Sequence, residues 1–248
     1  MWRVIVGAVI GFAVFDRIAA ATGSVRGEAG LVVAPVVILT LLVLDRLLFK
    51  HPLRASFVTL PLRAPDSRGM YAALAISAAL LLGYPLYAWL TGARLTLHPG
   101  WLLLLPGLIA QAGIAEELLF RGFVYGRLRD VYPFWRAALL SLIPFVAAHL
   151  ILFATMPPLI AGTAVLLSAV ISFPLARLYD LGGHTIWAPA LVHTVIQGSI
   201  KLVDVDAAHQ TSLALAWMGA CLVVPWLVFA VPRLPGGLKH LAPSPAPA

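Results

Sequence analysis

The chain has 248 residues, of which 61% are hydrophobic and 11% charged, and its mean hydropathy is +0.97. This composition excludes a soluble globular domain, because too little polar surface is available to face water, and it favours apolar spans in a lipid bilayer. The net charge of +7 does not indicate nucleic-acid binding, because the basic residues lie in short loops between apolar runs, which is typical of membrane proteins.

Apolar runs separated by polar residues predict an all-α, polytopic membrane helical bundle with about eight transmembrane helices. A single domain is expected over residues 1–232. The predicted spans are residues 3–21, 30–49, 69–91, 101–128, 136–154, 158–180, 185–203 and 212–232. Residues 233–248 are rich in Pro and Ala and are predicted to form a disordered cytoplasmic tail.

The first span has a competing interpretation as a cleaved signal peptide. Arg3 precedes an apolar run that ends in small residues at 19–21. Asp16 and Arg17 interrupt the place where a signal's apolar region should meet its cleavage site, so a retained span is preferred. The single cysteine, Cys221, lies in an apolar run and cannot form an internal disulfide.

Positive charges predict the orientation, because Lys and Arg concentrate in cytoplasmic loops. With the N-terminus inside, thirteen of the 17 basic residues lie on the cytoplasmic side, so both termini are expected there. The basic loop Lys50–Arg68 either lies on the anionic inner leaflet or simply sets the topology. The excess of arginine over lysine favours a GC-rich bacterial genome, so the expected location is a bacterial cell membrane, with membrane lipids as neighbours.

Two adjacent carboxylates and a guanidinium interrupt the fourth span, at Glu116, Glu117 and Arg121. Ionised groups at membrane depth are costly and by default mark a working site. Glu117 and Arg121 are four residues apart in the favourable order for a helical ion pair, whereas Glu116 is rotated by about 100° and faces another direction. The alternative is that the pair only pins two helices together, with Glu116 at a water-lined crevice.

Two histidines, His149 and His193, also fall at membrane depth. At about 1.5 Å of rise per residue from the predicted cytoplasmic ends, Glu116 lies roughly 18 Å deep, His149 roughly 20 Å and His193 roughly 12 Å. Gln197 follows His193 by four residues and adds an amide to the same helical face. A lone buried histidine is more often a packing residue, but this common depth favours a shared site.

These side chains match two hydrolytic chemistries. A carboxylate and a histidine can take a proton from water, and imidazole and amide donors can stabilise the oxyanion. Alternatively, Glu116, His149 and His193 could hold a zinc ion, since two His and one carboxylate form a catalytic zinc set. The chain lacks H-E-x-x-H, and Tyr179-Asp180 and Gly198-Ser199 lack the surroundings of aspartyl or serine protease sites.

Three motifs on successive spans resemble the CPBP family, which contains the type II CAAX prenyl proteases and bacterial proteins of bacteriocin processing and immunity. They are EExxxR at Glu116 to Arg121, FxxxH at Phe145 to His149, and the Trp-Ala-Pro-Ala-Leu-Val-His run that ends at His193. The resemblance covers roughly residues 101–200. It implies an eight-helix intramembrane endopeptidase acting on a peptide or protein substrate in the membrane.

The resemblance also implies roles for individual residues. Glu116 and His149 would activate water, His193 and the residue four further on would line the oxyanion site, and Glu117 and Arg121 would support them. The family is usually labelled metalloprotease, although a metal-free glutamate mechanism is also argued, so a divalent metal (zinc) and a metal-free mechanism are equal alternatives. The last motif commonly reads HxxxN, whereas this chain has Gln197, whose amide reaches about 1.5 Å further; misplacement of about 1 Å can cost a hundredfold in rate.

That departure keeps a second hypothesis open: a non-catalytic membrane scaffold or immunity-type protein of the same family. A proton-coupled transporter that uses the buried carboxylates is a third. Neither the sequence nor the resemblance identifies the substrate.

Overall fold

The computed structural model describes residues 1–22, 29–52, 55–56 and 60–232, and this part of the chain is almost entirely helical. The predicted disordered tail, residues 233–248, lies outside the described residues. The elements in chain order are α1 (Trp2–Ala21), α2 (Gly30–Leu44), η1 (Asp45–Phe49), α4 (Ser67–Thr91), β1 (Leu95–Leu97), α5 (Trp101–Leu108), η2 (Ile109–Glu116), η3 (Leu118–Tyr125), α6 (Gly126–Arg129), α7 (Phe134–His149), η4 (Leu150–Ala154), α8 (Pro158–Leu181), α9 (Trp187–Leu202), β2 (Val203–Val205), η5 (Ala207–His209), α10 (Gln210–Val223) and η6 (Val224–Ala230).

These elements join into long helices that confirm the predicted all-α membrane bundle. Among the described residues, seven helices are long and apolar enough to cross a membrane: Trp2–Ala21, Gly30–Phe49, Ser67–Thr91, Trp101–Arg129, Phe134–Ala154, Pro158–Leu181 and Ala207–Ala230. The remaining predicted span, residues 185–203, corresponds to α9, which has only 16 residues. At 1.5 Å per residue α9 is about 24 Å long, shorter than the ~30 Å hydrocarbon layer.

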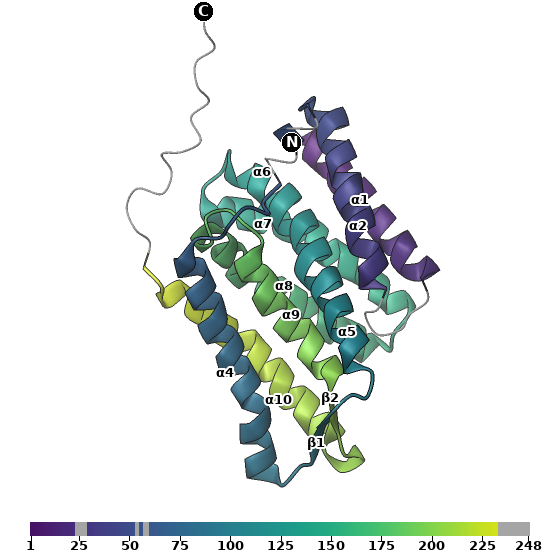
Figure 1. The fold of residues 1–248 in the computed structure, drawn as a ribbon, viewed down its shortest axis with the longest axis vertical. Helices are drawn as coiled ribbons and strands as arrows, with labels where there is room; N and C mark the ends of the chain where they lie inside the picture. Colours follow the sequence, from purple (N-terminus) through teal and green to yellow (C-terminus); the bar gives the residue numbers. More distant parts are fainter. Residues whose placement is uncertain (23–28, 53–54, 57–59, 233–248) are drawn as a thin grey trace, which may run out of the picture.

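A two-stranded ribbon, which the sequence did not predict, fills the end of the bundle beyond α9 (Figure 1). Gly92 ends α4 in the left-handed region with φ 74°, which glycine adopts without strain, and the chain then reverses into β1. β1 and β2 pair antiparallel, with Leu95 opposite Val205. Pairing satisfies backbone groups that would otherwise be costly to bury near lipid.

The apolar interior of the described chain contains two clusters of packed side chains. One joins α1, α2 and α7 around η3, and the other joins α4, α8, α9 and α10. In Figure 1, α1 and α2 lie on one flank, α4 and α10 on the other, and α5 and α9 run between them. Glu116 and Glu117 therefore lie close to the seam where the two clusters meet.

The first helix packs tightly onto the helix that carries the carboxylates. A Cβ added at Gly7 would lie 2.3 Å from the ring of Phe123, and one at Gly11 would lie 2.7 Å from Leu119. Only residues without side chains allow this approach. In the structure α1 is thus an integral part of the bundle. That this helix is retained, and not removed as a signal peptide, stays a prediction.

The connector after α2 crosses the opposite end of the bundle from the ribbon and is tied to the turn before α9. The carbonyl of Pro61 accepts a hydrogen bond from the Ile186 N–H at 3.0 Å, and the Trp187 indole donates to the Leu62 carbonyl at 3.1 Å. Pro61 also rests on Gly122, where a Cβ would come within 2.8 Å of its ring. This segment thus fixes the start of α9 relative to the helix Trp101–Arg129, which carries Glu116 and Glu117 and is called the carboxylate helix below.

Candidate active site

The carboxylates lie on a backbone that is wider than the sequence predicted. We expected a regular α-helix over residues 101–128, but the hydrogen bonding of η2 and η3 is π-helical, from i to i+5. Pro106, which has no N–H to donate, precedes this stretch by three residues. Stretches of π-helix are frequent at functional sites, and hydropathy periodicity does not reveal them.

Glu117 occupies the centre of a buried hydrogen-bonded cluster. Its side chain is fully buried, and its Oε1 accepts from Arg121 Nη1 at 3.0 Å and from His193 Nδ1 at 2.6 Å. The predicted ion pair between Glu117 and Arg121 is therefore present. The link to His193 was not predicted, and it joins two helices more than 70 residues apart in the sequence.

Glu116 approaches the other nitrogen of the same imidazole. Its Oε2 lies 3.8 Å from His193 Nε2, too far for a hydrogen bond but close enough for a strong electrostatic interaction. The His193 ring therefore lies between two carboxylates, and Glu117 orients it. Glu116 itself is only 6% exposed, and among the described residues it forms no ion pair with Lys or Arg, whereas Glu117 is paired with Arg121.

His149 is oriented by its own helix. Its Nδ1 lies 2.8 Å from the Phe145 carbonyl oxygen, which can only accept, so the proton is assigned to Nδ1 and the lone pair to Nε2. Its ring packs edge to face against Phe145, with the two ring centroids 4.8 Å apart. The centroid of the Phe145 ring lies 6.3 Å from that of the His193 ring. Within the described residues, His149 is thus connected to the cluster through Phe145 and makes no direct hydrogen bond to Glu116.

Gln197 lies one turn beyond His193 on α9 and is partly buried. In the described part of the chain its amide makes no hydrogen bond. The structure therefore brings Glu116, Glu117, Arg121 and His193 together, with His149 next to them and Gln197 on the adjoining turn.

Comparison with known proteins agrees with this arrangement. The family described as "Type II CAAX prenyl endopeptidase Rce1-like" matches residues 98–199, which run from the turn before α5 into α9 and include every candidate site residue. This part of the chain is similar to that family, which supports the resemblance to the CPBP family. No curated protein and no solved structure matches it significantly.

The zinc set that the resemblance suggests does not fit the observed arrangement of the described residues. Across the described residues, no three His, Cys, Asp or Glu side chains are grouped so that they could hold a metal ion. Nδ1 of His193 is bound to Glu117 and Nδ1 of His149 to a carbonyl, which leaves the two Nε2 atoms and Glu116 as the possible ligands, but only His193 and Glu116 lie within 4 Å of each other. The chemistry below is therefore derived from the side chains alone.

Gly113 permits the close packing of η2, which carries Glu116, against α9, which carries His193. The sequence analysis did not identify this glycine. An added Cβ would lie 2.6 Å from Thr194 Oγ1 and 3.3 Å from the Ala190 carbonyl oxygen on α9. The signal in the sequence was a glycine one helical turn before two carboxylates.

We expect Gly113→Val to push η2 away from α9 and to lower kcat by about a hundredfold, because a shift of about 1 Å at a reacting group has that effect. Gly113→Ala should lose less, since the Thr194 hydroxyl can rotate. Steady-state kinetics checks both, with Gly83→Val as the control, because no atom lies within 4 Å of a Cβ at Gly83. Equal activity of Gly113→Val and wild type would show that close packing of η2 on α9 is not required for catalysis.

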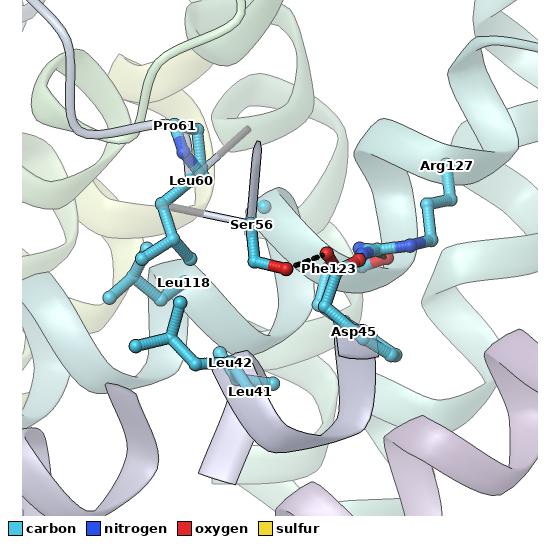
Figure 2. A pocket seen from close by; sticks show the side chains of 10 residues that line it. Leu41, Leu42, Asp45, Ser56, Leu60, Pro61, Leu118, Phe123 and Arg127 are labelled. Atoms are coloured by element: carbon cyan, nitrogen blue, oxygen red, sulfur yellow. Dashed lines mark hydrogen bonds and ion pairs between the residues drawn. The ribbon is translucent and has the colours of Figure 1, made fainter. Parts of the chain in front are cut away.

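A second polar cluster joins the end of the helix that carries the carboxylates to η1 and to the connector that follows it (Figure 2). Asp45 forms an ion pair with Arg127 and accepts hydrogen bonds from Ser56 Oγ at 2.7 Å and from His51 Nδ1 at 3.0 Å. The cluster lines a cavity of about 20 Å³, room for one water molecule. It ties the basic connector to the carboxylate helix, and the sequence did not predict it.

The polar side chains of Tyr179-Asp180 and Gly198-Ser199, the two dipeptides that lack the surroundings of protease sites, form hydrogen bonds between and within helices. Asp180 accepts from the Tyr125 hydroxyl at 3.0 Å and from Arg129 Nε at 2.9 Å, which joins α8 to the end of the carboxylate helix. Ser199 accepts from the Tyr84 hydroxyl at 3.2 Å and donates to the Val195 carbonyl at 2.7 Å.

Proposed function

We propose that the protein is an intramembrane endopeptidase that hydrolyses a peptide bond of a membrane-associated or lipid-modified substrate. The observation that carries this proposal is the imidazole of His193 held between Glu116 and Glu117 in the interior of a membrane bundle. The similarity of residues 98–199 to a prenyl endopeptidase family supports it. Buried acid and imidazole pairs at membrane depth are costly, so a functional reason for keeping them is expected.

Water activation is assigned to Glu116 and His149. The free Nε2 of His149 and the carboxylate of Glu116 are the two groups able to accept a proton from water. Glu117 is unsuited to this role, because its side chain is fully buried, its Oε1 already accepts two hydrogen bonds, and its Oε2, which has no partner, is sealed off from water. As the proton leaves, the water oxygen attacks the carbonyl carbon and a tetrahedral oxyanion forms.

The oxyanion is assigned to His193 and Gln197. Glu117 fixes the His193 ring through Nδ1, and the Nε2–H of the same ring is the group that donates to developing negative charge. When the C–N bond breaks, the proton taken from water returns to the leaving nitrogen. The products are a carboxylic acid and an amine, the acid passes its proton to the amine to give a carboxylate and an ammonium group, and no net proton is gained or lost by the site.

Activity of the purified protein in detergent tests this proposal. The probes are S-farnesylated peptides with a free carboxyl terminus and unmodified apolar peptides of equal length, analysed by mass spectrometry for a new terminus. Cleavage of either class supports the proposal, and the cleaved class identifies the substrate preference. Elemental analysis of the same sample tests the zinc alternative. The positive-charge bias further leads us to propose that both termini are cytoplasmic.

Replacing Gln197 with asparagine should raise kcat. Asparagine restores the amide reach of the usual family motif, and if glutamine displaces the donor by about 1 Å the gain is up to about a hundredfold. Gln197→Leu should be less active than wild type, because it removes the donor altogether. Single-turnover rates of the three proteins check this order; Gln197→Asn slower than wild type would mean that this site is adapted to the longer side chain.

The unpaired amide of Gln197 favours one alternative, a membrane scaffold or immunity-type relative without catalysis. Complementation of a deletion strain separates the two functions. If Glu116→Gln and His149→Ala both restore the wild-type phenotype, hydrolysis is dispensable and the alternative holds.

A further inference from the structure

Phe145 contacts more of the candidate site than any role assigned so far explains. It is 1% exposed, and the Arg121 guanidinium carbon lies 4.1 Å above its ring. Its ring edge meets His149 at 4.8 Å, and its carbonyl oxygen accepts the His149 Nδ1–H at 2.8 Å. One residue on α7 thus contacts both the guanidinium of the carboxylate helix and one of the two histidines.

The ring is the second of two constraints on Arg121. Nη1 donates to Glu117, but Nη2 has no hydrogen-bond partner in the described structure although the side chain is only 2% exposed. With a single hydrogen bond, the guanidinium plane could pivot about Nη1. A face-on aromatic ring stabilises one position of a desolvated cation and so removes this freedom.

The position of Arg121 reaches the second histidine through Glu117. Glu117 Oε1 is shared by Arg121 and His193, so a movement of the guanidinium displaces the carboxylate that orients the imidazole. Phe145 therefore acts on His149 directly, through its carbonyl oxygen. It acts on His193 indirectly, because its ring holds the guanidinium of Arg121, which binds the Glu117 carboxylate, which in turn binds the imidazole.

We propose that Phe145 is a positioning residue that orients both histidines, with its ring face holding Arg121 and its backbone holding His149. The inference rests on the proposed hydrolysis. The negative face of the ring, and not ring volume alone, carries the effect on His193. The histidine of α7 and the histidine of α9 are thereby aligned by one residue.

Fluorinated phenylalanines test this role, because fluorine withdraws electron density from the ring face and changes its size little. Incorporation of 4-fluoro-, 3,5-difluoro- and pentafluorophenylalanine at position 145 should lower kcat in that order, by about tenfold for the last, with KM within twofold. The apparent unfolding temperature should stay within a few degrees of wild type. A loss of packing alone would not grade with ring charge.

Phe123 provides a matched control. Its ring also lies under a guanidinium, with Arg127 Cζ at 4.0 Å, and it belongs to the carboxylate helix, but it faces the Asp45 cluster. The same fluorinated series at position 123 should leave kcat unchanged. An equal loss at both positions, or no loss at position 145, would overturn the positioning role.

Three further proteins separate failure of this inference from failure of the proposed function. Phe145→Leu should lose at least as much kcat as the pentafluoro protein, since it keeps bulk and removes the ring face. Wild type and Glu116→Gln are assayed beside it. Cleavage by wild type but not by Glu116→Gln, together with a flat fluorination series, overturns the inference alone; absence of cleavage by wild type overturns both.

Discussion

Replacing Glu116 with glutamine should abolish peptide cleavage, lowering kcat by about 10² to 10⁴. Glutamine keeps the size of the side chain but can no longer accept the proton of the attacking water. The change also removes a charge at 3.8 Å from His193 Nε2, so the imidazole loses one of its two carboxylate neighbours while Glu117 still orients it. The protein should therefore fold and express as wild type does.

Rates of product formation from a cleaved peptide measure this effect, and Asp180→Asn is the control. Asp180 is another carboxylate with buried partners, but it contacts Tyr125 and Arg129 at the end of the bundle and lies outside the candidate site. Asp180→Asn should keep activity within a few-fold. Unchanged turnover of Glu116→Gln would remove Glu116 from the mechanism.

Replacing Arg121 with methionine should destabilise the protein by about 3–5 kcal/mol, the usual cost of breaking a buried ion pair from one side. Glu117 is fully buried, and without Arg121 its negative charge keeps only the His193 hydrogen bond. The Phe145 ring would also lose its cation. For a chain of this size the corresponding fall in unfolding temperature is on the order of 10 °C.

The chain's single cysteine gives a direct measurement. Cys221 is buried, so a thiol-reactive fluorophore reports unfolding as it becomes exposed on heating. Adding Glu117→Gln to Arg121→Met should recover part of the lost stability, because the orphaned charge is gone. Arg136→Met, at an exposed arginine that lies over Tyr132, should change little. A double variant no more stable than Arg121→Met would show that the ion pair is not the source of the effect.

The helices were predictable because membrane spans carry a strong local signal. Each predicted span has its helix in the structure, and the predicted pair of Glu117 and Arg121 is present, since residues four apart on one helix are neighbours whatever the tertiary fold. The roles of Glu116, His149, His193 and Gln197 stay predictions, to be decided by the kinetics above.

Contacts between helices were harder to predict. The change to π-helix at Ile109 alters the rotation of every later side chain, and hydropathy cannot reveal it because this helix is apolar on most sides. For the same reason the sequence did not show that His193 binds Glu117 through Nδ1 while Nε2 faces Glu116. Depth along each helix was computable from the sequence, but rotation about each axis was not.

The ribbon and the Asp45 cluster were missed for another reason. β1 and β2 have three residues each, too few for any periodic pattern, and they pair across more than 100 residues. Asp45, Ser56 and Arg127 come from three separate segments whose spacing carries no motif. Such contacts depend on how the bundle closes.

The shortness of α9 has a consequence for biogenesis. A segment of 16 residues that carries His193, Gln197 and Lys201 is a poor substrate for the translocon, which favours about 20 apolar residues. Its insertion therefore depends on the helices synthesised before and after it. Since α9 supplies His193, the nascent chain carries its two glutamates into the bilayer well before a complete site can form.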